Sequence, residues 1–103
     1  MTRGFGSDTN PGDGDRVKIA VDLEGGVVME ARVSGNGCEV STKASSALAR
    51  LVRGRARTEA LAISVSDITD QIGPVDEERE RCVLTAIGAL HAAIVDAHLK
   101  AIA

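Results

Sequence analysis

Aromatic side chains are almost absent from this chain, and Phe5 is the only one among 103 residues. Proteins that bind nucleic acids usually combine aromatic rings, on which bases stack, with an excess of positive charge. Here the net charge is -3. We therefore expect no binding of nucleic acid. Hydrophobic residues still make up 44% of the sequence, so a core can be built from valine, isoleucine, leucine and alanine.

Long apolar runs are also missing. No segment approaches the ~18–20 apolar residues of a membrane span, and glycine, aspartate and asparagine occupy the place of a signal peptide's apolar stretch. We expect a cytoplasmic protein that does not associate with membranes. In that compartment cysteines usually serve as thiols or metal ligands and not as disulfides. The chain has two, Cys38 and Cys82.

The common catalytic motifs are absent as well. The sequence contains no GxSxG, Walker loop, HExxH or CxxC pattern, and we expect a protein that is not an enzyme. Its length predicts one small domain. Glycine, proline and polar residues over 1–14 indicate a flexible N-terminal loop, which leaves residues 15–103 as the single folded domain.

Two segments alternate between apolar and polar residues, as strands with one buried face do. In the first, 16–23, the inward positions are Val17, Ile19, Val21 and Leu23. In the second, 27–33, we expect Val27, Met29, Ala31 and Val33 inward. Glycines at 25 and 26 form the turn, so the two segments predict an antiparallel hairpin.

The period changes after the hairpin. From Ser41 apolar residues follow helical spacing, with Ser41 or Thr42 as the cap and Gly54 as the end. Residues 58–72 predict one or two short helices. A helix of roughly 25 residues follows, with Asp76, Glu77 and Glu78 in its first turn, and we expect it to cover the sheet. The fold class is therefore α+β, a small antiparallel sheet with helices packed on one face.

Four residues are candidates for one site. Cys38 follows the glycine pair 35 and 37 at the start of a helix, where the dipole and free N–H groups favour a thiolate. Cys82 opens the long helix beside two arginines, while Asp13 and Asp15 flank a glycine. Each has a simpler interpretation: a small buried residue for Cys38, a core position for Cys82 and a solvated turn for the aspartates.

The two histidines are poor candidates for the same site. His91 lies nine residues past Cys82 and His98 sixteen, which places both on the far side of the same helix. Two cysteines and two aspartates then remain as the obvious ligands. Zinc and iron–sulfur sites usually hold more sulfur or imidazole than this.

Three segments of the chain resemble the iron–sulfur cluster assembly scaffolds of the IscU, NifU N-terminal and SufU type. Asn10–Asp15 resembles their Asn-Pro-x-Cys-Gly-Asp motif, and Gly35–Ser41 resembles Gly-x-Gly-Cys-x-Ile-Ser. Arg79–Cys82, followed by Ala89-Leu90, resembles the Arg-x-Lys-Cys…Ala-Leu segment of the SufU branch. The motifs occur in the family's order, which makes their combination specific.

The resemblance implies a SufE/IscU-like α+β fold in which three cysteines and one aspartate gather at one end. In the family these residues hold a nascent 2Fe–2S cluster, iron or, in the SufU branch, zinc, and the protein works with a cysteine desulfurase and cluster-receiving apoproteins. By position, Asp15, Cys38 and Cys82 match the aspartate and the second and third cysteines. Asp13 stands in place of the first cysteine, and a carboxylate can ligate metal but cannot carry a persulfide.

Three functions are consistent with this resemblance. The first is a scaffold-like protein that binds iron, a 2Fe–2S cluster or zinc through Asp13, Asp15, Cys38 and Cys82. The second is a zinc-binding, SufU-like modulator or sulfur-transfer partner. The third is a divergent interaction protein without metal.

Overall fold

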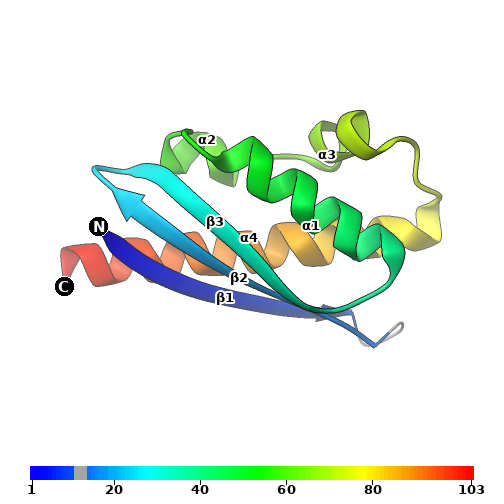
Figure 1. The fold of residues 1–103 in the computed structure, drawn as a ribbon, viewed down its shortest axis with the longest axis horizontal. Coiled ribbons are helices and arrows are strands. Elements are labelled where there is room, and N and C mark those ends of the chain that lie inside the picture. The colour runs from blue at the N-terminus through cyan, green and yellow to red at the C-terminus, as the bar shows by residue number, and fades with distance from the viewer. Residues whose placement is uncertain (11–13) are drawn as a thin grey trace.

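A three-stranded antiparallel sheet, in the order β1-β2-β3, carries all the helices on one of its faces (Figure 1). The computed structural model describes residues 1–10 and 14–103, with the side chains of Asp15 and Asn36 left out. The strands are β1 (Thr2–Asn10), β2 (Asp15–Glu24) and β3 (Val27–Asn36). The helices are α1 (Glu39–Val52), α2 (Arg57–Leu61), α3 (Val65–Ile72) and α4 (Glu77–Ile102). The predicted fold class is confirmed.

Strand β1 corrects one expectation. The flexible loop predicted over residues 1–14 is wrong for residues 2–10, which pair with β2 along their whole length. The residues of β1 that face α4 include Gly4 and Gly6, and a Cβ at either would collide with backbone atoms of α4. The helix therefore packs directly on the strand's backbone, and this close contact requires glycine. Because glycine replaces apolar side chains at these positions, the sequence of β1 shows no alternation of apolar and polar residues. Residues 11–13 lie outside the described part of the chain.

The hairpin of β2 and β3 is confirmed, but a β-bulge changes which residues of β3 point inward. Leu23 pairs with Val28 and Asp22 with Glu30, which leaves Met29 as the extra residue. Val28 is therefore buried and Met29 is exposed, contrary to the expected inward placement of Val27 and Met29. Beyond the bulge the inward residues are again the predicted ones, because Ala31 pairs with Val21 on the buried face.

The helices close the core over the inner face of the sheet. The buried residues of α1 include Ala44, Ala47, Leu48 and Val52, all fully enclosed. Residues 57–72 form two short helices, and Ser64 caps the second through Asp67. Helix α4 runs along β1 and β2 and extends past the sheet at its C-terminal end (Figure 1). It is long and apolar enough to cross a membrane, but 56% of its most apolar window is buried in the fold.

A cross-strand ion pair ties β1 to β2 on the open face. Arg3 donates to Asp22 through Nε at 2.8 Å and through Nη2 at 3.2 Å, and the two residues are register partners. Hydrogen bonding from Arg3, against the opposing effect of partial burial, lowers the pKa of Asp22 from its ordinary 3.8. The carboxylate therefore binds its proton less readily in the folded chain than in the unfolded chain.

Asp22→Asn is expected to reduce the acid sensitivity of the fold. Because the folded pKa of Asp22 is lowered, the ion pair stabilises the protein above about pH 4, and this contribution is lost as the pH falls through the folded value. Between about pH 5 and pH 2 the Tm of the wild type should fall further than that of the variant. Glu24→Gln, an exposed acid on the same strand, is the control. Parallel losses of Tm in wild type and Asp22→Asn would contradict the role of this pair.

Candidate functional site

Cys38 is the N-cap of helix α1. Its Sγ accepts a hydrogen bond from the backbone N–H of Ser41 at 3.3 Å, and its carbonyl accepts one from the N–H of Thr42 at 3.0 Å. The expectation that Ser41 or Thr42 caps this helix is therefore wrong. The sulfur thereby satisfies one of the N–H groups that a helix leaves unpaired at its start.

Gly35 fixes the turn that presents Cys38. Its φ is 128°, and a Cβ there would collide with the carbonyl oxygen of Arg16 on β2. Only glycine lets β3 stay this close to β2 and then turn into α1 within three residues. Position 35 therefore places the cysteine at the end of the sheet.

Cys82 faces Cys38 across the interface between α1 and α4. The Cys38 thiol donates to the Cys82 sulfur, and the Sγ–Sγ distance is 3.1 Å. The two sulfurs are not joined by a disulfide. Cys82 is 1% exposed, whereas Cys38 is partly exposed to solvent. The structure thus brings together two predicted site residues 44 positions apart, one reachable from solvent and one enclosed.

The starts of α1 and α4 also interact electrostatically. Glu39, in the first turn of α1, forms an ion pair with Lys43 at 2.9 Å, and this hydrogen bond lowers the pKa of Glu39. The charge of Arg79 on α4 acts in the same direction. Arg79 pairs with Asp76 at 4.0 Å and is exposed. The two ion pairs are each local to one helix start, and the charge of Arg79 is the electrostatic link between them.

The two aspartates stay predictions as site residues. Asp13 lies outside the described residues. The backbone of Asp15 begins β2 opposite Asn10, and the next residue, Arg16, is the register partner of Asn36 on β3. Asp15 is therefore at the end of the sheet where β3 leads into Cys38. Within residues 1–10 and 14–103, side chains 15 and 36 excepted, no cluster of three or more metal-binding residues forms.

The histidines lie away from this end. His91 and His98 follow Cys82 on α4 by about 13 and 24 Å of helix rise. His91 is partly buried, and its Nε2 has no hydrogen-bond partner among the described residues.

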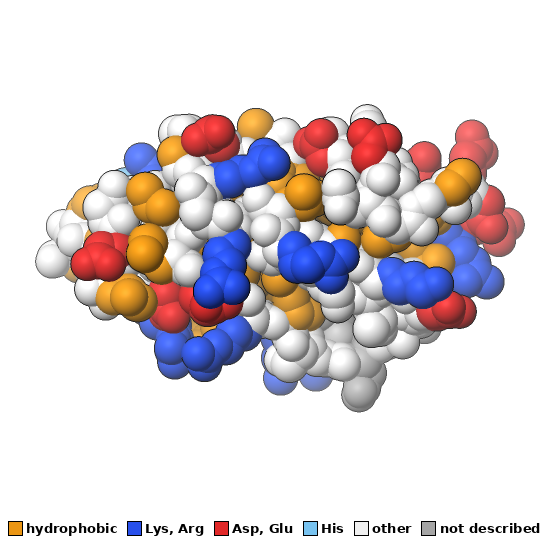
Figure 2. All heavy atoms as spheres, turned by 45° about the horizontal axis from the view of Figure 1, so that its top comes forward, with side chains coloured by type: hydrophobic (Ala, Val, Ile, Leu, Met, Phe, Trp, Pro, Cys, Tyr) orange, Lys and Arg blue, Asp and Glu red, His pale blue; other side chains and the backbone are white. Residues whose placement is uncertain are grey.

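Charged side chains surround the end where α4 begins. In Figure 2, seen from the helical side, acidic groups gather at this end with basic groups beside them. The exposed charged residues of this end include Glu77, Glu78 and Arg81 at the start of α4 and Glu39 in the first turn of α1. Helix α4 carries three acidic residues in its first turn, where the dipole favours negative charge. The partly exposed Cys38, as the N-cap of α1, adjoins the charged first turn of that helix.

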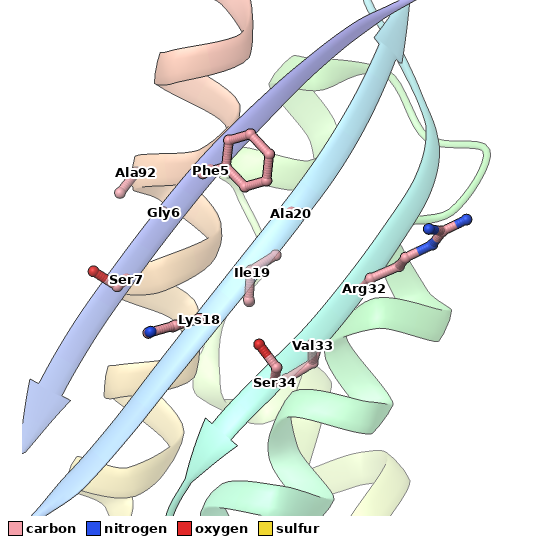
Figure 3. Close-up of a pocket in the computed structure, with 10 residues that line it drawn as sticks. All are labelled: Phe5, Gly6, Ser7, Lys18, Ile19, Ala20, Arg32, Val33, Ser34 and Ala92. Atoms are coloured by element: carbon pink, nitrogen blue, oxygen red, sulfur yellow. The ribbon is translucent and has the colours of Figure 1, made fainter.

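A groove lies elsewhere, on the open face of the sheet (Figure 3). It has a volume of ≈ 550 Å³ and its cationic members are Lys18 and Arg32. Its floor follows two cross-strand rows, Phe5–Ala20–Arg32 and Ser7–Lys18–Ser34. Neither cysteine lines it, so the groove and the thiol pair are separate features.

The pair can supply two of the ligands of a metal. In a tetrahedral zinc site with bonds of about 2.3 Å, two thiolates lie about 3.8 Å apart. The observed 3.1 Å means that the sulfurs would separate by about 0.7 Å to admit the ion. The partial exposure of Cys38 provides access. The described residues thus fit a metal as a pair of thiolates, and further ligands must come from elsewhere.

Comparison with known proteins identifies the family. The model of the NifU-like N terminal domain matches residues 2–102. The nitrogen fixation protein NifU of a Nostoc species is 35% identical over 83 residues, which cover 81% of this chain and 28% of that protein. The iron–sulfur cluster assembly scaffold protein IscU of Aquifex aeolicus is 30% identical over 99 residues, covering 94% and 63%. This chain therefore spans between a quarter and two thirds of these relatives.

Solved structures show the same fold. A NifU-like N-terminal protein from Brucella abortus superimposes with a TM-score of 0.72 at 18% identity, over 93% of this chain and 79% of that one. A putative SUF-system scaffold from Fervidobacterium islandicum gives 0.71 at 17%, over 88% and 79%. The match to this family, with a relative named as a scaffold protein, agrees with the prediction that the chain is not an enzyme. The chain belongs to the NifU-like N-terminal domain family of iron–sulfur cluster assembly scaffolds.

Proposed function

We propose that this protein binds iron, a nascent 2Fe–2S cluster or zinc at the end of the sheet where α1 and α4 begin. The observation that carries the proposal is the 3.1 Å distance between the Cys38 and Cys82 sulfurs, one of which is partly exposed. Asp13 and Asp15 complete the site as carboxylate ligands, which bind iron and zinc more weakly than thiolates do. The metal or cluster is cargo, held for transfer.

The partners are those of the family. A cysteine desulfurase supplies sulfur, and cluster-receiving apoproteins accept the product, in the cytoplasm. With a carboxylate at position 13, the site holds its cargo through two thiolates, so the cluster is more labile than one bound by three. Lability favours release to a recipient, because the recipient's ligands compete against weaker bonds.

A zinc-binding role is the second candidate. One relative, 33% identical over 55 residues, is the zinc-dependent sulfurtransferase SufU of Bacillus subtilis. In this role the chain holds zinc through the same four residues and acts with a desulfurase without holding a cluster. The third candidate, a metal-free interaction protein, keeps only the fold.

Anaerobic purification followed by measurement of iron, zinc, acid-labile sulfide and the visible spectrum separates these functions. We expect iron with sulfide and the visible absorption of a cluster. Zinc without sulfide would support the second candidate in its place. If no metal is retained either anaerobically or after reconstitution with iron, sulfide or zinc, the proposal is wrong. Glu24→Gln, remote from the thiols, should load as the wild type does.

A further inference from the structure

Only one pair of residues in this sequence can bind a transferred sulfur atom covalently as a persulfide. Cys38 and Cys82 are the only cysteines among the 103 residues. A sulfur atom delivered as a persulfide must be accepted by a thiolate, because the thiolate is the nucleophile. Whatever sulfur this chain carries covalently, it therefore carries on one of these two.

Burial decides which cysteine meets a donor. A persulfide on another molecule has to approach the accepting sulfur closely. Cys82 is 1% exposed on the buried side of α4, whereas Cys38 is partly exposed at the N-cap of α1, where β3 leads into that helix. The N–H of Ser41 donates a hydrogen bond to the Cys38 sulfur and holds it in place. Cys38 is therefore the acceptor.

The distance between the two sulfurs favours a second, intramolecular step. Reacting atoms held at about 3–3.5 Å are in a near-attack arrangement, which raises the rate of an intramolecular step greatly over the same step in solution. The Sγ–Sγ distance of 3.1 Å falls in this range. Once Cys38 carries an extra sulfur, the buried sulfur of Cys82 is already beside it.

We propose that the pair converts a bound persulfide into hydrosulfide. In the first step the Cys38 thiolate attacks the outer sulfur of the donor persulfide; a new S–S bond forms on Cys38 and the donor leaves as a thiolate. In the second step the Cys82 thiolate attacks the Cys38 Sγ; the Sγ–Sγ bond forms, and the outer sulfur leaves with the electron pair as hydrosulfide. The proton of the Cys82 thiol passes to solvent or to the departing sulfide.

Electrons balance without an added reductant in these two steps. The transferred sulfur is reduced to sulfide, and the two cysteine sulfurs are oxidised to a disulfide. A dithiol reductant then returns the pair to its starting state through a mixed disulfide. The reaction is stoichiometric until that reductant acts. This inference rests on the proposed function, since it assigns the source of sulfide at the same site.

The test uses the full chain, reduced, freed of metal with a chelator and kept without oxygen, with glutathione persulfide as the probe. Hydrosulfide release and intact protein mass are followed together. The wild type should release close to one hydrosulfide per chain and lose about 2 Da as the disulfide forms. Cys82→Ser should retain the sulfur on Cys38, a gain of about 32 Da, and release at least tenfold less sulfide. Cys38→Ser should do neither.

Three controls make the result decisive. Cys82→Ala is run beside Cys82→Ser, and the melting curve of each variant shows that it is folded. A sample without protein measures spontaneous decay of the persulfide. Stable persulfide on wild-type Cys38 without sulfide release, or persulfide accumulating on Cys82 in Cys38→Ser, would overturn the inference. The persulfide assay contains no metal, so its outcome is independent of metal loading. Release of hydrosulfide by a protein that does not load metal would refute the scaffold role alone. Metal loading without release of hydrosulfide would refute only the sulfide-releasing role.

Discussion

Gly6→Ala is expected to lower the free energy of unfolding by about 3 kcal/mol or more, although it adds a single methyl group. The added Cβ would meet the Ala89 carbonyl oxygen and the Ala93 nitrogen, which are backbone atoms of α4 and cannot rotate away. Either β1 separates from the helix or α4 shifts across the sheet. For a domain of this size the Tm should fall by about 12 °C or more, as measured by calorimetry or circular dichroism.

Ser7→Ala is the matched control for this substitution. Residue 7 is the next in the same strand, points to the open face and is exposed. Its Tm should change by no more than the equivalent of about 0.5 kcal/mol. If Gly6→Ala and Ser7→Ala melt together, the close packing of β1 on α4 does not exist in solution.

Metal retention should follow the number of thiolates at the proposed site. Cys38→Ser lowers that number to one and should reduce zinc affinity by more than about 100-fold, because losing a residue that only hydrogen-bonds to a metal ligand already costs about 10–100-fold. Asp13→Cys raises the number to three and should increase affinity by about tenfold or more, since zinc prefers thiolate to carboxylate. Competition against a chromophoric chelator under anaerobic conditions measures both.

Ser66→Cys provides the control for the added thiol. It introduces a cysteine on the exposed side of α3 and should leave the affinity unchanged. An unchanged affinity in Cys38→Ser would remove the thiol pair from the site. An unchanged affinity in Asp13→Cys would show that residue 13 lies away from the metal. It would also contradict the proposed match between Asp13 and the first cysteine of the family motif.

The hairpin and the helices could be predicted because their buried residues are apolar and periodic. Val17, Ile19 and Val21 alternate as a half-buried strand must, and all three are enclosed. Strand β1 has no such signal, since its contact with α4 is made by Gly4 and Gly6. The bulge at Met29 also escaped prediction. Val27, Val28 and Met29 are all apolar, so the sequence does not show which of them face the core before the bulge shifts the register.

The proximity of the two cysteines was predictable for a different reason. Spacing alone does not place Cys38 beside Cys82, and the expectation that they meet came from the order of three motifs. The capping role of Cys38 was missed because cap preferences favour hydroxyl and carboxylate side chains, and a sulfur that accepts from Ser41 has no such signature. Asp13 and Asp15 stay predictions as ligands.

The packing of β1 on α4 also has a consequence for the order in which the chain becomes functional. A ribosome makes β1 before, and α4 after, every other described element. Cys82 follows Cys38 by 44 residues, which translation adds in roughly 2 to 9 s. Until α4 emerges, β1 has no helix to cover its glycines and Cys38 has no second sulfur. Completion of one helix thus covers the sheet and holds the two thiols side by side in the same event.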